Sequence, residues 1–538
     1  MNRKILIPLL LILPAVLFIT AGLLKFAQGP FYLNFYDPSY VYLINGLNLA
    51  QLNGYGVGHF DHPGTTVQVI CAAVIKIYYS FTSSNSDLVN DVFARPEDYL
   101  LKINIVLNFI NCFVLFLFGY FFYSRSKNLP VTFFLMISPF VSTELFYGMI
   151  IDTPDNLLVS ASLLVMGIIF YCLYKKENEY SLKEIIIFSV VIAFGLATKL
   201  NFIPMIFIPM IMLNGMKNKL VYLLFVLIFF IIFILPGISN MDYFINWVEG
   251  LILKEGKHGK GAATVFNTYS FPKNLISIFA TDPLFGLTYL IILSVYIFTV
   301  ITKFRFKKTE TFFPAEIKFR LLTAVLTAMT LQIIIVSKHY AQYYMIPSFM
   351  LTVTGLYLSY LVITALKPGS VNSIRKKYLY ITTVSVMSLW ITYQLVSSYY
   401  EGTEMKESAY EMVDFVEKQY KDSEVIPAFG TANKDIPLAF ATIYAGSRKE
   451  FYKNILEKKL RSDIYFNQWV NEFYFISDPE VSLRKLKSKK SIILQLSAYG
   501  SINGFLDRLR EYTGSPELTY GKIFTNGNNE SAYEIYLR

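Results

Sequence analysis

Long apolar runs recur along the first 400 residues, and every second connection between them is a short basic segment. Of the 538 residues, 54% are hydrophobic and only 16% are charged, whereas a soluble protein of this length carries about a quarter charged residues. A run of about 20 apolar residues can cross a bilayer as a helix. The sequence therefore predicts a polytopic α-helical membrane protein, with the lipid bilayer as its first partner.

We place about eleven crossings on the chain. They lie near 5–26, 100–122, 130–147, 154–174, 184–199, 202–216, 219–238, 283–302, 317–336, 342–366 and 378–397. The fifth and sixth runs are short, which indicates a broken hairpin. The first run is long for the apolar core of a signal peptide and has no convincing cleavage site, so it is interpreted as an uncleaved span.

Basic residues mark alternate connections, as the positive-inside rule requires of cytoplasmic loops. They are Arg3 and Lys4, Arg125 and Lys127, Lys175 and Lys176, Lys217 and Lys219, Lys303, Arg305, Lys307 and Lys308, and Arg375, Lys376 and Lys377. The pattern predicts that the N-terminus is inside and the C-terminal region outside. Much of the net charge of +10 lies in these segments, so it does not indicate a nucleic acid partner.

Two domains follow from this topology. Residues 1–400 form a transmembrane domain whose first outer loop, 27–99, contains two amphipathic helices that we expect to lie in the membrane interface. Residues 401–538 alternate helix and strand patterns, with strands expected near 424–430, 473–477 and 491–497 and a closing hairpin at an Asn-Gly turn. The tail is therefore predicted to be a small extracytoplasmic α/β domain.

The notable polar residues of the membrane part all fall on the predicted outer side. Ionisable groups at membrane depth are costly and usually mark a site. They lie in the first loop, in the turn before the fourth span, between the two short spans, in a glycine-rich loop and in a late turn. In chain order they are Asp37, Asp61, His62, Asp152, Asp155, Lys199, Lys257, His258, Lys260, Lys338, His339 and Tyr340.

Four segments on this side resemble the motifs of a known enzyme superfamily. They read FYDPSYVYLINGLNLAQLNGYG with FDHPGTTVQ, then FYGMIIDTPDNLLVSASLLVMG, GLATKLNFIPMIFIP and SKHYAQYYMIPSFML. In order, spacing and orientation they resemble the GT-C fold glycosyltransferases that use polyprenyl-phosphate sugars, such as the aminoarabinose transferases and the protein O-mannosyltransferases. His62 stands where those families usually have Lys. The resemblance covers roughly residues 1–400.

The resemblance implies an inverting glycosyltransferase with a GT-C-like fold in a bacterial inner membrane, with its site facing the periplasm or exterior. The donor would be a sugar on a polyprenyl phosphate, and the acceptor a hydroxyl of a lipid, glycan or protein. Attack on the sugar needs a base, for which Asp37 is the first candidate and Asp61 the second. Cations would hold the departing phosphate. These would be Lys199, Lys338, His339, His62, Lys257, His258 and Lys260, while Asp152, Asp155 and Tyr340 would shape the sugar or acceptor pocket.

Each residue also has a plainer interpretation. Asp37 before Pro38 is a good helix cap, as is the turn containing Asp155, and Lys199 can extend to the membrane boundary. No cofactor is indicated with certainty. A divalent metal held by Asp61, His62 and His339 stays open as an alternative.

Two other functions compete with glycosyl transfer. A polysaccharide polymerase or ligase of the envelope generally has its large catalytic loop late in the chain, whereas the ionisable features here begin in the first loop. A lipid-linked-sugar transporter or flippase calls for polar residues deep in the spans and a repeat between halves. The sequence shows no such repeat.

Overall fold

The structure is a computed structural model of the full chain. It describes residues 3–34, 36–54, 56–82, 87–175, 179–254, 261, 263–264, 268–305, 313–366, 373–514 and 518–537. By compactness the chain divides into two units. One, here called the membrane unit, comprises Met1–Gly22, Phe60–Val67 and Ile105–Val396, and the other, the α/β unit, comprises Leu23–His59, Gln68–Asn104 and Ser397–Arg538.

Eight helices in the described residues are long and apolar enough to cross a membrane. They are α1 (Arg3–Gln28), α4 (Thr65–Thr82), α6 (Pro96–Ser126), α9 (Pro154–Tyr174), α12 (Met216–Ile234) continued by η3 (Leu235–Asn240) and α13 (Met241–Leu253), α15 (Pro283–Arg305), α16 (Phe313–Lys338), and α17 (Ile346–Leu366) preceded by η6 (Gln342–Met345). The chain is thus a polytopic helical protein, as predicted. Helix α4, expected to lie in the interface, passes the same test with the lowest mean hydropathy of the eight, 1.2.

Two predicted crossings are broken or short. Helix α7 (Leu129–Met136) with η1 (Ser138–Phe140) bends by 66° into α8 (Thr143–Ile150), and counting this pair as one span gives up to nine in the described residues. Helix α10 (Leu182–Thr198) is followed by η2 (Leu200–Ile206) and α11 (Phe207–Met212). Because Pro204 and Pro209 lack a backbone N–H, the chain there forms short helical pieces. The last predicted run, 378–397, falls within α18 (Ser373–Gln419).

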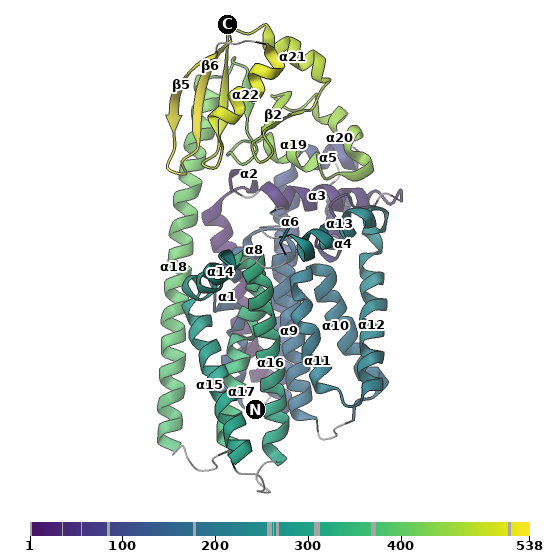
Figure 1. Ribbon diagram of the computed structural model, residues 1–538, viewed down its shortest axis with the longest axis vertical. Helices are drawn as coiled ribbons and strands as arrows, with labels where there is room; N and C mark the ends of the chain where they lie inside the picture. The colour runs from purple at the N-terminus through teal and green to yellow at the C-terminus, as the bar shows by residue number, and fades with distance from the viewer. Residues whose placement is uncertain are drawn as a thin grey trace. The chain divides into compact units, whose positions relative to one another are not determined.

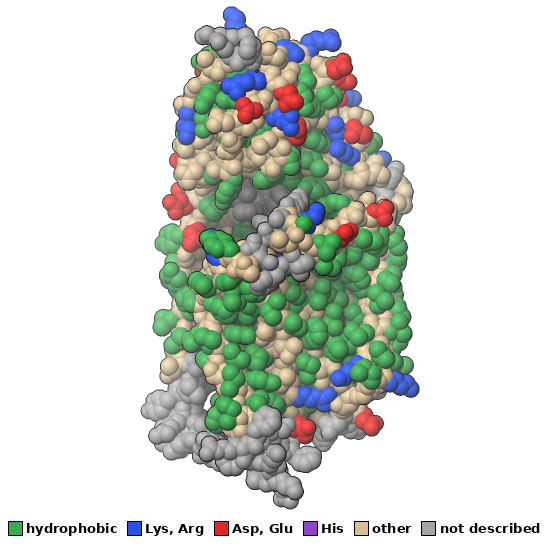
Figure 2. All heavy atoms as spheres, viewed as in Figure 1, with side chains coloured by type: hydrophobic (Ala, Val, Ile, Leu, Met, Phe, Trp, Pro, Cys, Tyr) green, Lys and Arg blue, Asp and Glu red, His purple; other side chains and the backbone are tan. Residues whose placement is uncertain are grey.

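The membrane unit is a bundle of long helices. Helices α9, α10 and α12 pack in series, and α9 also contacts α17, which packs on α16 and α15 (Figure 1). Hydrophobic side chains cover most of the visible side of this bundle (Figure 2). On α12, for example, Leu224, Leu227 and Ile231 are exposed. Apolar side chains turned outward on a bundle are expected where the surrounding solvent is lipid.

The α/β unit contains a four-stranded sheet in the order β1-β4-β6-β5, with β1 and β4 parallel and the other pairs antiparallel. Strands β5 and β6 lie side by side in Figure 1. Its strands are β1 (Val425–Pro427), β4 (Ser491–Leu496), β5 (Leu518–Thr525) and β6 (Ser531–Leu537), and a separate hairpin pairs β2 (Ile464–Asn467) with β3 (Glu472–Phe475). Its short helices are α2 (Phe31–Asn34), α3 (Tyr36–Ala50), α5 (Leu88–Ala94), α19 (Ile436–Thr442), η7 (Gly446–Arg448), α20 (Lys449–Leu456), α21 (Pro479–Lys487) and α22 (Ile502–Thr513). The predicted small α/β region is confirmed.

Strand β4 shows how the sheet is covered on both faces. Ile492 and Leu494 pack with Phe505 of α22, whereas the intervening Ile493 packs with Met412 and Val416 of α18. Alternate residues of a strand point to opposite faces, so an unbroken apolar run is what a strand buried on both sides requires.

Helix α3 of the first loop is hydrogen bonded to the C-terminal part of the same unit. Asn45 Nδ2 donates to the Tyr444 carbonyl at 3.1 Å, and Asn48 Nδ2 donates to the Ala445 carbonyl at 3.0 Å. Residues nearly 400 positions apart therefore meet in one compact unit.

Gly58 allows the closest approach in this contact. A Cβ at this position would overlap the backbone nitrogen of Gly446 and the carbonyl oxygen of Tyr444. We expect Gly58→Ala to separate the two segments at a cost of about 2 kcal/mol or more. Hydrogen exchange of residues 444–446 measures the effect, and Gly521→Ala is the control, because nothing lies within 4 Å of a Cβ there. Equal protection in both variants would refute the prediction.

Candidate functional site

Two segments far apart in the chain meet at the break after α10. Pro63 and Lys199 form an isolated antiparallel bridge, and the Leu200 N–H donates to the His62 carbonyl at 2.9 Å. The hydroxyls of Thr66 and Thr198 lie 2.8 Å apart. The FDHPGTTVQ and GLATKLN motifs are therefore joined within the membrane unit.

Lys199 is the centre of a buried polar cluster. Its Nζ donates to both carboxylate oxygens of Asp155, at 2.7 and 2.8 Å, and also lies 4.5 Å from the ring centre of Tyr343 and 5.0 Å from that of Tyr344. Only 4% of Lys199 and 7% of Asp155 are exposed. A buried charge persists only when it is paired. This contact joins a third and a fourth predicted motif to the first two.

The turn before α9 positions Asp155. The Thr153 side chain accepts the Asp155 N–H and Pro154 begins the helix, so Thr153 is the cap. The sequence left two interpretations of Asp155, as a helix cap or as a pocket residue. In the structure Thr153 caps α9, and Asp155 forms the ion pair with Lys199. Asp152, three residues before Asp155, is completely buried.

Asparagine side chains hold this turn in place. Asn108 of α6 donates to the Met149 carbonyl at 2.9 Å, and Asn156 donates to the same carbonyl at 3.1 Å. Asn111 also donates to the Asn156 side chain at 2.7 Å. The end of α8 and the start of α9 are thus fixed by amides, which rigidifies the segment that carries Asp155.

Asp61 and His62 form a second polar pair. The His62 Nδ1 lies 2.8 Å from Asp61 Oδ1, and the His62 ring is 5.9 Å from that of Trp247 in α13. Asp61 is 9% exposed. The backbone bridge of Pro63 to Lys199 places this pair next to the buried cluster.

The late turn at 337–340 binds the end of α13. Lys338 Nζ donates to the carbonyls of Leu251 and Ile252 at 2.8 and 2.6 Å, and His339 Nε2 is 2.7 Å from the Leu251 carbonyl. The last carbonyls of a helix lack intrahelical partners and carry partial negative charge, so cations bind there. Tyr340 Oη lies 3.5 Å from Thr281 Oγ1 of α14 (Ser270–Thr281).

Two acidic residues of this region were not singled out from the sequence. Asp282 is 2% exposed and accepts the Phe285 N–H at 3.1 Å at the start of α15. Burial raises the pKa of Asp282 to about 6, against the opposing effect of hydrogen bonds from the Ser142 side chain and the Phe285 N–H. Glu144 of α8 lies close enough to interact electrostatically with Asp155, Asp282 and Lys199. The sequence signal that could have identified Glu144 is a single acidic residue inside an apolar run.

The structure locates some predicted residues only in part. Asp37 is in the first turn of α3, and its side chain lies outside the described residues. The backbone before it is held by Glu97, whose carboxylate accepts the N–H groups of Phe31 and Tyr32 at 2.8 and 3.0 Å. Lys257, His258 and Lys260 lie outside the described residues.

The metal alternative is met only in part, because Asp61 and His62 lie 2.8 Å apart and both belong to a group of potential ligands, whereas His339 does not. His339 directs Nε2 at the Leu251 carbonyl. Among the described residues, the set Asp61, His62 and His339 does not occur as a group whose ligand atoms lie within 4.8 Å of one another.

The fold and this cluster define a multi-pass helical membrane protein with a buried, charged site at the ends of its helices. No family model matches the chain, and no curated protein matches it. Among solved structures it is similar to ArnT from Cupriavidus metallidurans, crystallised with undecaprenyl phosphate, over 97% of both chains, with a TM-score of 0.44 and 9% identity. A fold alone does not determine function, which depends on the side chains of the site.

Proposed function

We propose that the chain is an integral-membrane inverting glycosyltransferase that moves a sugar from a polyprenyl-phosphate donor to a hydroxyl acceptor. The observation that carries the proposal is the convergence of four polar segments, at 61–66, 152–155, 198–201 and 343–344, around Lys199 in the membrane unit. A charged site in a lipid-facing bundle suits a substrate with an anionic head and an apolar tail.

Lys199 is assigned to the donor phosphate. An ammonium group has three hydrogens to donate, and Asp155 accepts from it through both oxygens. The remaining hydrogen serves the phosphate, while Asp155 fixes the direction of the side chain. As the sugar leaves, negative charge grows on the phosphate, and a preorganised cation stabilises it most at that stage.

The base is assigned to one of two carboxylates. Asp37 remains the first candidate by resemblance, and Asp61 the second, with His62 beside it to orient the carboxylate or to contact the phosphate. Asp152 and Glu144 are assigned to the sugar pocket together with Tyr340. Lys338 and His339 act on the substrate indirectly, by holding α13 in place.

The proposed setting is the outer face of a bacterial inner membrane, with residues 1–400 as the catalytic domain and 401–538 on the exterior side. Basic connections on the opposite side support this orientation. Undecaprenyl phosphate is the simplest carrier, and the acceptor is a lipid, glycan or protein hydroxyl.

The function is tested with purified protein in lipid nanodiscs supplied with labelled polyprenyl-phosphate sugars and a panel of acceptors. Transfer is expected from the intact protein, and Asp37→Asn should lower it by about 10²–10⁴-fold because the acceptor hydroxyl loses its base. Asp98→Asn is the matched control, being an exposed acid of the same loop. Movement of the lipid-linked sugar across vesicles without any transfer would instead identify a transporter.

A further inference from the structure

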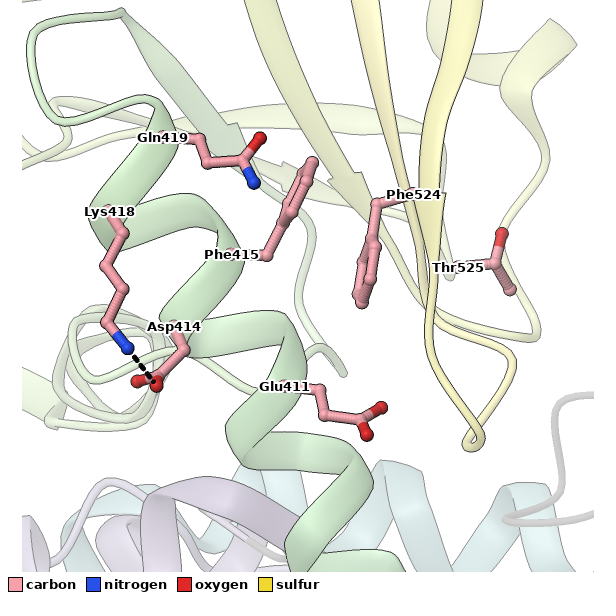
Figure 3. Close-up of a pocket in the computed structure, with 7 residues that line it drawn as sticks. All are labelled: Glu411, Asp414, Phe415, Lys418, Gln419, Phe524 and Thr525. Carbon is pink, nitrogen blue, oxygen red and sulfur yellow. Dashed lines mark hydrogen bonds and ion pairs between the residues drawn. The ribbon is translucent and has the colours of Figure 1, made fainter.

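The described residues of the α/β unit contain two hollows beside α18. The first is an open groove between α18 and β5, in which Phe415 stacks on Phe524 with ring centres 4.3 Å apart and Lys418 pairs with Asp414 (Figure 3). Its polar side chains, Glu411 and Gln419 included, are exposed. Water satisfies such groups, so the groove has no chemistry that requires a ligand.

The second hollow is smaller and more enclosed. It has a volume of about 110 Å³ and lies between α18 and the sheet, where it is bordered by Ala432–Asp435, the segment that follows β1, and by Gln495 near the end of β4. Strands β1 and β4 are parallel. In sheets with parallel strands, ligands bind in the crevice outside the carboxyl ends of the strands.

Gln495 presents a buried donor to this pocket. Its side chain is completely buried, and its Oε1 accepts a hydrogen bond from Asn433 Nδ2 at 2.9 Å. Because Asn433 also lines the pocket, the amide group lies at the pocket wall. Among the described residues, none accepts a hydrogen bond from Gln495 Nε2. A buried donor without a partner is costly, so a rotation of the amide that brings Nε2 to an acceptor in the pocket is favoured.

The charged groups around the pocket are balanced and already engaged. Lys434 pairs with Glu417 at 2.8 Å, and Arg461 donates through Nη2 to the carbonyls of Lys421 and Tyr420. Asp435 accepts the Arg461 N–H at 2.7 Å. An anion would have to break the cation contacts, whereas a neutral ligand with hydroxyls leaves them intact.

We propose that this pocket binds a neutral sugar residue. A sugar hydroxyl accepts from Gln495 Nε2 and donates to a carboxylate such as Asp435, while Val413 and Val416 contact the C–H edge of the ring. The pocket volume of about 110 Å³ is below the roughly 150 Å³ of a cavity that admits benzene, so the pocket would receive only one edge of a pyranose while the rest of the ring stays outside. The site deepens the proposed function, since it would hold a sugar of a glycan acceptor.

The test measures binding alone, so its failure is distinguishable from failure of the transferase proposal. The full chain is placed in lipid nanodiscs, because glucoside and maltoside detergents are themselves sugars. Methyl glycosides of glucose, mannose and galactose are the probes, read by saturation-transfer NMR and by hydrogen-exchange protection of 428–435. At least one should bind with a Kd on the order of 1 mM.

Gln495→Leu removes the donor at nearly constant volume and should weaken binding by about tenfold. Asn433→Ala, which releases the Gln495 amide, should act in the same direction and serves if Gln495→Leu does not fold. Gln419→Leu in the open groove is the matched control and should bind as the unmodified chain does. The proposal fails if no neutral glycoside binds, if Gln495→Leu binds normally, or if glucuronate or inorganic phosphate binds in preference.

Discussion

Replacing Lys199 with methionine should abolish sugar transfer and destabilise the membrane unit by about 3–5 kcal/mol. The ammonium group of Lys199 contacts both oxygens of Asp155, and both side chains are buried. Methionine fills similar space but leaves the carboxylate charged and unpaired in a medium of low dielectric constant. The thermal midpoint in nanodiscs and the rate of transfer from a labelled polyprenyl-phosphate sugar are the two measurements.

A double variant separates the two effects. Adding Asp155→Asn to Lys199→Met removes the stranded charge, so most of the thermal stability should return. Transfer should stay absent, because the donor phosphate still lacks its cation. Recovery of transfer in the double variant would show that Lys199 serves only to neutralise Asp155.

Asp61→Asn should lower the turnover rate by about 10²–10⁴-fold at saturating donor if its carboxylate is the base. The protein should melt at a nearly unchanged temperature, since the amide is the same size as the carboxylate and keeps its place 2.8 Å from His62. His62→Gln keeps a donor beside the carboxylate and should cost much less.

The pH profile decides between the two acids. If Asp61 is the base, the acidic limb of the turnover profile should disappear in Asp61→Asn and persist in Asp37→Asn. A change confined to KM in Asp61→Asn would assign it to acceptor binding and leave Asp37 as the base.

Much of the fold is readable from the sequence where the signal is local. The apolar runs predicted the spanning helices, and Gly514 ends α22 in the left-handed conformation. The Asn526–Gly527 pair lies in the turn between β5 and β6. Each depends on a few neighbouring residues.

Individual residues of the candidate site could be proposed from the sequence, but their pairing could not. Sequence patterns identified Lys199 and Asp155 as separate candidates. They could not predict that the two residues pair, because no periodicity links positions 44 apart. Their ion pair exists because the α8–α9 turn and the break after α10 meet in space. Asp282 escaped notice for the same reason, since its side-chain partner Ser142 caps α8 and lies 140 positions earlier in the chain.

The long-range contacts of α3 have a consequence for biosynthesis. Asn45 and Asn48 leave the ribosome almost 400 residues before Tyr444 and Ala445 are made. At about 5–20 residues per second, the first loop waits roughly 20–80 s for its partners. During that interval the amides and apolar side chains of the first loop stay exposed. A chaperone or protease would therefore act on this chain at that stage of its synthesis.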